Sequence, residues 1–368
     1  MIRVLHFVST PSIGSGVMSV IMNYYRNIDR SKLQFDFLCF IPCKDSYIDE
    51  IERLGGHVFF VLKPGSSMRS VWELRNFFCE REGEYQFFHN HEVYLSFILK
   101  PMTQYYGIPH FIIHAHATKY SDRKFAAIRN AVLCMPIRFM KCERFACSLA
   151  AAEFLYGKKQ IRSREVKIFY NAINIQAYQF EEQRRIEIRK ALGIDGDAQV
   201  IGHVGRFTPQ KNHEFVMRVY SEYRKQNEKS KLICVGEGAL KRDIEALANE
   251  YGIADDVIFL GQRQDVADLL NAMDVFLLPS VFEGFPVALV EAVSNGLNCL
   301  VSDTIADEIV SKQVKRLSLE QSPKVWADTL WELSSRTEVN NDETYLLDKS
   351  YDILYQAKCM QEFYLNER

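Results

Sequence analysis

The sequence predicts an α/β protein built from two doubly wound domains. Short runs of β-branched and aromatic residues alternate with longer segments of helical period, which is typical of βα units and parallel sheets. At 368 residues the chain is also longer than one hydrophobic core usually accommodates. The runs form two series separated by a polar, charged segment at 178–198, where we place a linker.

The two series give the expected strands and domain limits. The first comprises 3–9, 35–40, 57–61, 87–91, 111–116 and 144–148, and the second comprises 200–204, 231–235, 257–260, 275–278 and 298–302. We expect an N-terminal Rossmann-like domain over 1–177, a second over 178–345, and a C-terminal helix over 346–368 that packs back on the first domain. Ligands of such sheets bind beyond the carboxyl ends of the strands, so two similar halves imply a cleft between them.

Composition narrows the class of protein. The net charge of -2 argues against nucleic acid as the main partner, and nine cysteines without C-x-x-C spacing indicate reduced thiols and no zinc ribbon. The N-terminus has the form of a first strand and lacks the pattern of a signal peptide. The longest apolar stretch, 125–140, is interrupted by Arg129 and Pro136, so no transmembrane helix is expected. These observations favour a cytoplasmic globular protein.

A first candidate site is the loop at 204–213, between an expected strand and an expected helix. It carries Arg206 and Lys211, and at the carboxyl end of a strand both cations can point into a cleft where a diphosphate needs neutralisation. Two solvated surface cations are the alternative interpretation.

A second candidate site is the segment 278–292. Pro286 suits a first helical turn and Gly296 can end that helix, which leaves Glu283 in the preceding loop. Free backbone N–H groups near the start of the helix favour a phosphate there. Glu291 lies about one turn inside the helix, where it can accept hydrogen bonds from ribose hydroxyls. A capped helix with a surface glutamate is the alternative. The residues expected around the phosphate are Gly284, Phe285, Pro286 and Val287.

At these residues the chain resembles the retaining family 4 glycosyltransferases of the GT-B fold, particularly bacterial enzymes of capsular and exopolysaccharide assembly. The family's Glu-x7-Glu pattern is matched by Glu283 and Glu291. Its Gly-Arg and Lys-Asn element is matched at 205–206 and 211–212. Further matches at 235–238, 259–266 and 302–303, and in the first domain, keep the family order, so the resemblance covers nearly the whole chain.

The resemblance implies a role for each matched residue. Arg206 and Lys211 would hold the donor diphosphate, Glu291 the ribose hydroxyls, and Glu283 hydroxyls of the transferred sugar. The backbone around Arg263 would meet the nucleotide base. The loop of Gly14, Ser15 and Gly16 would contact the distal phosphate, although relatives commonly have a Gly-Gly pair there.

Two His-x-His pairs, at 89/91 and 114/116, each place imidazoles on one face of a strand. A metal site is imaginable, but no acidic or cysteine ligand accompanies either pair, so we expect none. The family pattern puts a histidine in the cleft, and His116 matches it best. It would hydrogen bond to the donor sugar and support the reacting centre. His114 is expected in the core or in a supporting position beside the site. His89 and His91 are weaker candidates for lining the acceptor side.

The segment 119–144 interleaves basic and apolar residues. Such a stretch can lie on an anionic membrane surface, where a lipid-linked acceptor would be found. A domain helix with a solvated basic face is the alternative. The sequence therefore leaves open a peripheral association with the inner face of the plasma membrane.

Together these features predict a retaining glycosyltransferase. It would transfer a hexose or N-acetylhexosamine from a nucleotide sugar, expected to be UDP-linked, to a glycan or lipid-linked acceptor. Arg206, Lys211, Glu283 and His116 would serve catalysis, with no cofactor and, lacking an Asp-x-Asp element, no metal. Rival interpretations are an epimerase or hydrolase on the same fold, or a non-catalytic sugar-nucleotide binder. A dinucleotide oxidoreductase fits poorly because positions 19 and 241 lack the third glycine of G-x-G-x-x-G.

Overall fold

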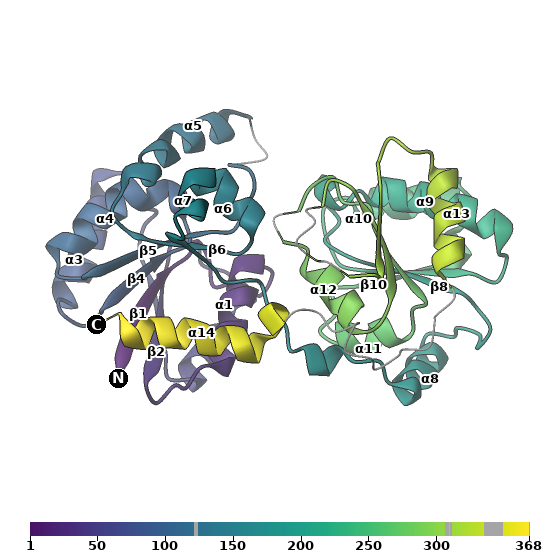
Figure 1. Cartoon of the computed structure of the whole chain (residues 1–368), viewed down its shortest axis with the longest axis horizontal. Coiled ribbons are helices and arrows are strands. Elements are labelled where there is room, and N and C mark those ends of the chain that lie inside the picture. The colour runs from purple at the N-terminus through teal and green to yellow at the C-terminus, as the bar shows by residue number, and fades with distance from the viewer. Residues whose placement is uncertain (121–123, 284, 306–308, 310, 335–348, 368) are drawn as a thin grey trace. The chain divides into compact units, whose positions relative to one another are not determined.

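The chain folds into two compact units, each built around its own parallel sheet (Figure 1). The computed structural model describes residues 1–120, 124–283, 285–305, 309, 311–334 and 349–367. The first unit comprises Met1–Ala172 and Ser350–Arg368, and the second comprises Ile173–Lys349. The chain therefore leaves the first unit a few residues before 177 and returns to it for its last helix.

The first unit has seven parallel strands in the order β3-β2-β1-β4-β5-β6-β7. The six predicted strands are present, and a short seventh strand, β7, extends the edge of the sheet. The strands are β1 Ile2–Phe7, β2 Leu33–Cys39, β3 Val58–Phe60, β4 Phe87–Asn90, β5 His110–Ala115, β6 Glu143–Ala146 and β7 Val166–Ile168.

Helices connect these strands in the manner of βα units. The first begins after the glycine loop, where the Ser15 hydroxyl caps it by accepting from the Met18 N–H at 3.4 Å. The α-helices are α1 Gly16–Asn27, α2 Ile48–Arg53, α3 Met68–Glu80, α4 Ser96–Tyr105, α5 Lys124–Cys134, α6 Leu149–Tyr156 and α7 Lys158–Arg162, with 3-10 turns η1 Val93–Leu95 and η2 Met135–Phe139.

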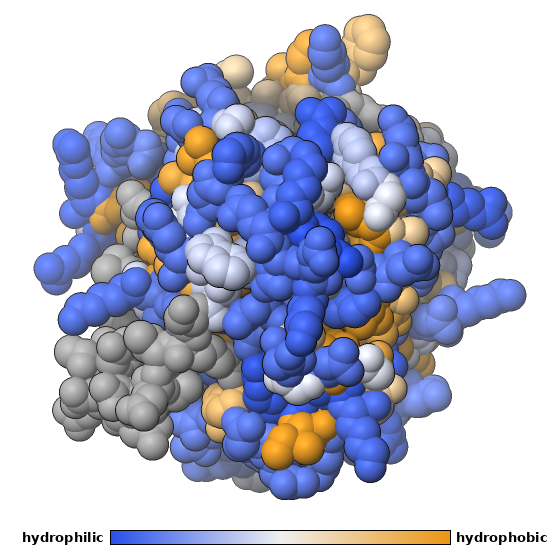
Figure 2. Space-filling model, turned by 90° about the vertical axis from the view of Figure 1, so that its right-hand side faces the viewer, coloured by the Kyte–Doolittle hydropathy of each residue, from blue (hydrophilic) through white to orange (hydrophobic). Residues whose placement is uncertain are grey.

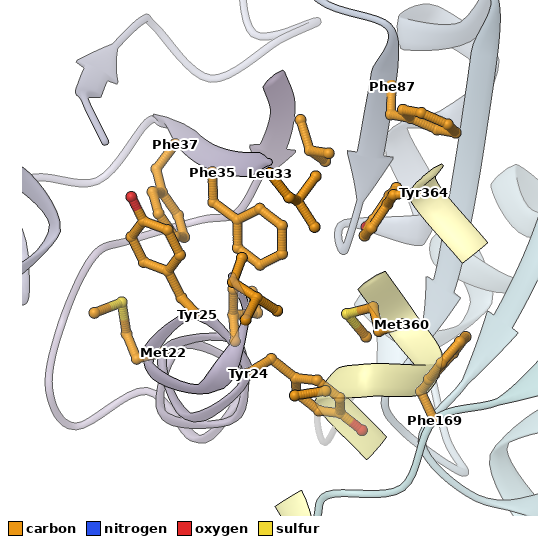
Figure 3. Packing of buried hydrophobic residues seen from close by; sticks show 14 of the residues in the cluster. Met22, Tyr24, Tyr25, Leu33, Phe35, Phe37, Phe87, Phe169, Met360 and Tyr364 are labelled. Atoms are coloured by element: carbon orange, nitrogen blue, oxygen red, sulfur yellow. The ribbon is translucent and has the colours of Figure 1, made fainter. Parts of the chain in front are cut away.

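The C-terminal helix α14, Ile353–Asn366, belongs to the core of the first unit. It lies beside α1 and covers the same face of the sheet (Figure 1). Met360 and Tyr364 from α14 pack with Tyr24 from α1 and Phe35 from β2 (Figure 3). Because these side chains are almost fully buried, the unit is incomplete without the last helix of the chain.

The second unit has six parallel strands in the order β10-β9-β8-β11-β12-β13. The five predicted strands are present, and β13 adds an edge. The strands are β8 Val200–Val204, β9 Lys231–Val235, β10 Val257–Gly261, β11 Val275–Leu278, β12 Asn298–Ser302 and β13 Val314–Leu317. The helical segments are η3 Ile175–Tyr178, α8 Glu182–Ala191, η4 Pro209–Lys211, α9 His213–Gln226, α10 Lys241–Glu250, η5 Ala254–Asp256, α11 Val266–Asn271, α12 Val287–Ser294 and α13 Pro323–Leu333, with η7 Lys349–Tyr351 at the return.

The segment predicted as a linker is part of the second unit. Its helix α8 packs against α11, and Arg189 of α8 is buried with Asp274 as its ion-pair partner at 2.7 Å. The polar composition that suggested a linker reflects this buried ion pair and the solvated side of the helix. The view onto the α8, α9 and α13 side of the molecule is largely hydrophilic, with orange residues only in small separate groups (Figure 2).

Two further expectations concern membranes and thiols. Among the described residues, no helix is long and apolar enough to cross a bilayer. All nine cysteines are free thiols.

Candidate active site

The loop after β8 carries two of the predicted cations in different environments. The Lys211 stem lies against Gly205, where an added Cβ would come within 2.9 Å of the Lys211 Cδ, so glycine at 205 makes room for this side chain. Arg206 is exposed and forms no ion pair with any residue that the structure describes. One cation is thus held in place, and the other is open to a ligand.

Lys211 and Glu283 form a nearly buried ion pair. The Lys211 Nζ lies 2.7 Å from the Glu283 Oε1, and the two side chains are only 16% and 6% exposed. The amide of Gln210 donates to the other carboxylate oxygen of Glu283 at 3.1 Å. The predicted cation and carboxylate therefore meet, and Gln210 is a partner that the sequence did not indicate.

Glu291 lies in the second turn of α12, where the hydroxyl of Tyr178 donates to its Oε1 at 2.8 Å. Burial raises the pKa of Glu291 to about 7, while the Tyr178 hydrogen bond and the nearby Lys211 charge act in the opposite direction. Since Lys211 acts on both carboxyls, Lys211, Glu283 and Glu291 form one cluster. Tyr178 is a further member that the sequence did not reveal, because it precedes Glu291 by more than a hundred positions.

The start of α12 differs in part from the expectation. Its N-cap residue is Pro286, and the Val287 N–H donates to the Phe285 carbonyl at 3.1 Å, so that group is not free as predicted. The proline removes a donor and bends the chain so that this short turn forms. The Ala288 N–H has no acceptor within the described chain. Gly284 lies outside the described residues.

Arg263 follows β10 and is engaged by its own loop. Its guanidinium binds the Asp265 carboxylate through two hydrogen bonds, of 2.8 Å from Nε and 2.5 Å from Nη2. This bidentate pair holds the loop in shape. The predicted role of the Arg263 backbone toward a nucleotide base remains a prediction.

The predicted glycine loop of the first unit precedes α1. A Cβ at Gly16 would meet nothing within 4 Å, and one at Gly14 would make only an ordinary contact with the Ser12 hydroxyl. Neither glycine has positive φ, so the fold itself does not demand glycine there. The Ser15 side chain is used in capping the helix. Contact of this loop with a phosphate stays a prediction.

The two histidine pairs lie side by side on one face of the first sheet, together with His6 of β1. Register pairs His6 with His89, and the pairs from β4 and β5 are neighbours. The imidazoles form two hydrogen-bonded chains. One joins His6 to His91 at 3.0 Å and His91 to His116 at 2.7 Å. The other joins the Tyr364 hydroxyl to His89 at 2.6 Å and His89 to His114 at 3.0 Å.

His116 also opens onto a cavity of about 220 Å³ within the first unit. His91, Glu92, Tyr94, Lys119 and Tyr120 line the same cavity. Asn130 adds a further polar group, and the rest of the wall is mostly apolar. Of the histidines in the cluster, His91 and His116 line this cavity, whereas His89, which the sequence also suggested for the acceptor side, does not. The roles of these histidines toward donor and acceptor stay predictions. His6 and Tyr364 were missed because single residues far apart in the chain give no local pattern.

Solved structures share this architecture over nearly their full length. A structure of Anabaena Alr3699/HepE in complex with UDP and glucose superposes with a TM-score of 0.79 at 16% identity and covers 100% of both chains. The apo lipopolysaccharide outer core galactosyltransferase WaaB gives 0.69 at 18% identity, covering 99% of this chain and 100% of its own. At such identities the likeness concerns the fold. Two Rossmann-like units of this kind make up the GT-B fold.

Sequence comparison defines the family within that class. The family model described as glycosyl transferases group 1 matches residues 184–342. The glycosyltransferase EpsF of Bacillus subtilis is 33% identical over 89% of this chain and 86% of its own length. The capsular polysaccharide biosynthesis glycosyltransferase CapH of Staphylococcus aureus is 25% identical over 100% and 99%. The chain belongs to the group 1 glycosyltransferases, and it is an enzyme of that kind.

Proposed function

We propose that the second unit binds a UDP-sugar and that the enzyme transfers the sugar with retention to a growing bacterial surface polysaccharide. The observation that carries this proposal is the cluster of Lys211, Glu283 and Glu291, with the exposed Arg206 on the same loop as Lys211 and in no ion pair with any described residue. Cations suit a diphosphate, and carboxylates suit the hydroxyls of ribose and sugar. UDP in the related Anabaena structures supports the choice of nucleotide.

The proposed catalytic role of the cluster is to stabilise charge in the transition state. As the anomeric carbon leaves the diphosphate, negative charge grows on the departing oxygens, and fixed cations stabilise it most when they are already in place. Lys211 is held by Gly205 and Glu283, whereas Arg206 can reach toward the ligand. Retention then follows if the acceptor hydroxyl enters from the face that the diphosphate leaves. No metal is needed for this charge.

The acceptor we propose is a glycan carried on a lipid. An Escherichia coli relative, 24% identical over 82% of this chain, is named a galactosyltransferase acting on a diphosphoundecaprenol-linked sugar. A Campylobacter jejuni relative over 39% of the chain is named for a diphospho-undecaprenol acceptor as well. EpsF and CapH support a place in exopolysaccharide or capsule assembly.

A donor assay tests the proposal. UDP release from a panel of UDP- and GDP-hexoses and N-acetylhexosamines is expected with one UDP-sugar, and it should rise when a lipid-linked glycan is added. The rate should be the same with and without Mn²⁺ or Mg²⁺. Donor consumption independent of acceptor would indicate a hydrolase, an epimerised donor would indicate an epimerase, and binding without turnover a non-catalytic module. A strict need for Mn²⁺ would contradict metal-free departure of the diphosphate.

We further propose that the first unit lies on the inner face of the plasma membrane through α5 and η2. Phe125 and Phe139 are 91% and 88% exposed, which is unusual for side chains of this size. Ile128, Val132 and Met135 are exposed between them. Basic side chains are exposed on the same segment, at Lys124, Arg129, Arg138 and Lys141. Exposed aromatics next to cations are suited to an anionic lipid surface.

Vesicle sedimentation checks this surface. The protein is expected to sediment at low salt with vesicles containing anionic phospholipid, and to bind neutral vesicles several-fold less. Replacing Phe125 and Phe139 with serine should lower the bound fraction about tenfold, since two aromatic side chains leave the lipid. Trp72→Ser removes an exposed aromatic from α3 and serves as the matched control. Equal sedimentation of all three proteins would exclude α5 and η2 as the binding surface.

The carboxyl of Glu291 makes a pH-dependent contribution to stability. Its pKa is raised to about 7 in the native state and is near 4.5 when exposed, so the native state holds the proton more tightly. The contribution is therefore present below about pH 4.5 and is lost as the pH rises to about 7, by an amount on the order of 2–3 kcal/mol. Glu291→Gln keeps an acceptor for Tyr178 and should lose less stability than the wild type between pH 5 and 8. If the melting temperatures of the two proteins change in parallel between pH 5 and 8, the Glu291 carboxyl does not titrate in that range.

A further inference from the structure

The five clustered histidines surround a single internal void. His6, His89, His91, His114 and His116 all line this void, whose volume is about 10 Å³, and the remaining wall is made by the side chains of α1, β2 and α14. That volume corresponds to about one small ion or one water. The imidazoles come from three adjacent strands, β1, β4 and β5, or from the residue directly after β4 and β5, so the sheet largely fixes their spacing.

Two groups of three imidazoles within this cluster have the spacing of metal ligands. One is formed by His6, His89 and His91, and the other by His91, His114 and His116. In each group, one ring nitrogen from each residue lies within 4.8 Å of the other two. In a tetrahedral zinc site with Zn–N bonds of about 2.0–2.1 Å, the ligand nitrogens are roughly 3.3 Å apart. The His91 Nδ1 and His116 Nε2 are 2.7 Å apart, so small ring rotations would open a place for an ion between them.

The hydrogen bonds of the ligand rings fit a metal site better than they fit the imidazoles alone. The His114 Nε2 is buried and has no hydrogen-bond partner, while its Nδ1 is engaged by His89, which in turn contacts the Tyr364 hydroxyl. The His91 Nε2 is engaged by His6 in the same way. A ring that ligates through one nitrogen and is oriented by a hydrogen bond at the other is the usual arrangement of metal-binding histidines.

The cluster also has the charge state that a metal needs. Burial lowers the pKa of His116 to about 3 and holds those of His91 and His114 well below the ordinary range, so the rings are neutral. Neutral imidazole is the form that ligates. The larger cavity beside His91 and His116 can supply a water as a fourth ligand, and Glu92 on its wall offers a carboxylate near the cation.

From these observations we propose that His91, His114 and His116 bind one zinc ion within the first unit. From the sequence alone a metal at the two histidine pairs is imaginable but not expected, because each pair supplies only two ligands; the third comes from the neighbouring strand. The site is independent of the donor cluster, which lies in the second unit. Zinc there would bind three residues of β4, β5 and the segments that follow them, and would fix the orientation of the His116 ring.

Metal content and spectroscopy test the proposal on the full chain. Protein purified without chelator and then dialysed is expected to hold about one zinc per chain. Metal-free protein titrated with Co²⁺ should develop the visible bands of a four-coordinate site, saturating at one equivalent. X-ray absorption of the zinc protein should show nitrogen neighbours at about 2.0 Å. Less than a tenth of an equivalent of zinc, together with no visible Co²⁺ bands, would overturn the proposal.

Variants locate the site. His114→Phe and His116→Phe each remove one ligand and should weaken Co²⁺ binding at least about tenfold. His110→Gln alters a histidine of the same strand that lies outside the cluster and should bind as the wild type does. Circular dichroism of each variant establishes that it is folded. If His114→Phe does not fold, Co²⁺ binding by His116→Phe is the deciding measurement, because His116 is less buried. Undiminished binding by folded His116→Phe would overturn the assignment of the ligands.

Discussion

Lys211→Ala is expected to lower kcat about 100-fold while changing KM for the donor much less. Fixed charge beside a leaving group acts mainly in the transition state, and loss of one such donor typically costs a factor of about 100–1000. Lys211 is fixed because Gly205 leaves room for its stem and Glu283 holds its ammonium at 2.7 Å. Steady-state kinetics with the donor identified by the release assay would measure the effect.

The same substitution also leaves Glu283 without its cation. Removal of one partner from a buried ion pair typically costs about 3–5 kcal/mol of stability, because the remaining charge stays buried. A low kcat could then reflect a partly unfolded enzyme. The double variant Lys211→Ala/Glu283→Gln, compared with Glu283→Gln alone, separates the two effects, because a neutral amide removes the isolated charge and can still accept from Gln210.

We expect the double variant to regain most of the lost stability and none of the lost kcat. Thermal unfolding and kinetics of the same preparations provide both readings. Should kcat recover with stability, the role of Lys211 would be structural and the proposed stabilisation of the diphosphate would be wrong. Arg206→Ala is the matched comparison, because Arg206 is exposed and forms no ion pair within the described chain, so it should lower kcat with no loss of stability.

Local sequence patterns predict the strands well, and they also single out Lys211, Glu283 and Glu291, which the structure brings together. Buried parallel strands are short apolar runs, so all eleven expected strands are found; β7 and β13 were missed because they are short, half-buried edge strands. Lys211, Glu283 and Glu291 could be named because each follows or faces a strand end, where parallel sheets gather functional groups. Their partners Gln210 and Tyr178 could not be predicted from the sequence, since no rule of spacing relates them to the carboxyls.

Long-range pairing is what the sequence does not display. His6 and Tyr364 join the histidine cluster from opposite ends of the chain, and only the strand order β1-β4-β5 and the return of α14 bring them there. The segment 178–198 was misplaced for a related reason. Charged residues usually indicate solvent, and a buried arginine is recognised only when its acidic partner is known.

Loss of the acidic partner of Arg189 is expected to have the second large effect, a loss of stability. Asp274 accepts from Arg189 at 2.7 Å, from Arg185 at 2.5 Å and from the Val200 N–H at 2.7 Å. Arg189 and Asp274 are 4% and 5% exposed, so Asp274→Asn leaves a guanidinium buried without its counter-charge. We expect a loss of about 3–5 kcal/mol, read as faster hydrogen–deuterium exchange in α8 and β11 and a lower urea midpoint for the second unit.

Two comparisons decide whether the unpaired charge causes the loss of stability in Asp274→Asn. Arg189→Met/Asp274→Asn removes the buried charge and keeps a side chain of similar length, so much of the stability should return. Asp197→Asn breaks an exposed pair with Lys229 and should leave the midpoint unchanged. If the double variant is as unstable as Asp274→Asn, the unpaired charge does not explain the loss, which then comes from the hydrogen bonds that Asp274 accepts, such as the one from the Val200 N–H. Recovery in the double variant is limited because Arg189 also donates to the carbonyls of Gly196, Ala198 and Ala272. In either case α8 is a structural part of the second unit, because its buried arginine ties the segment before β8 to the start of β11.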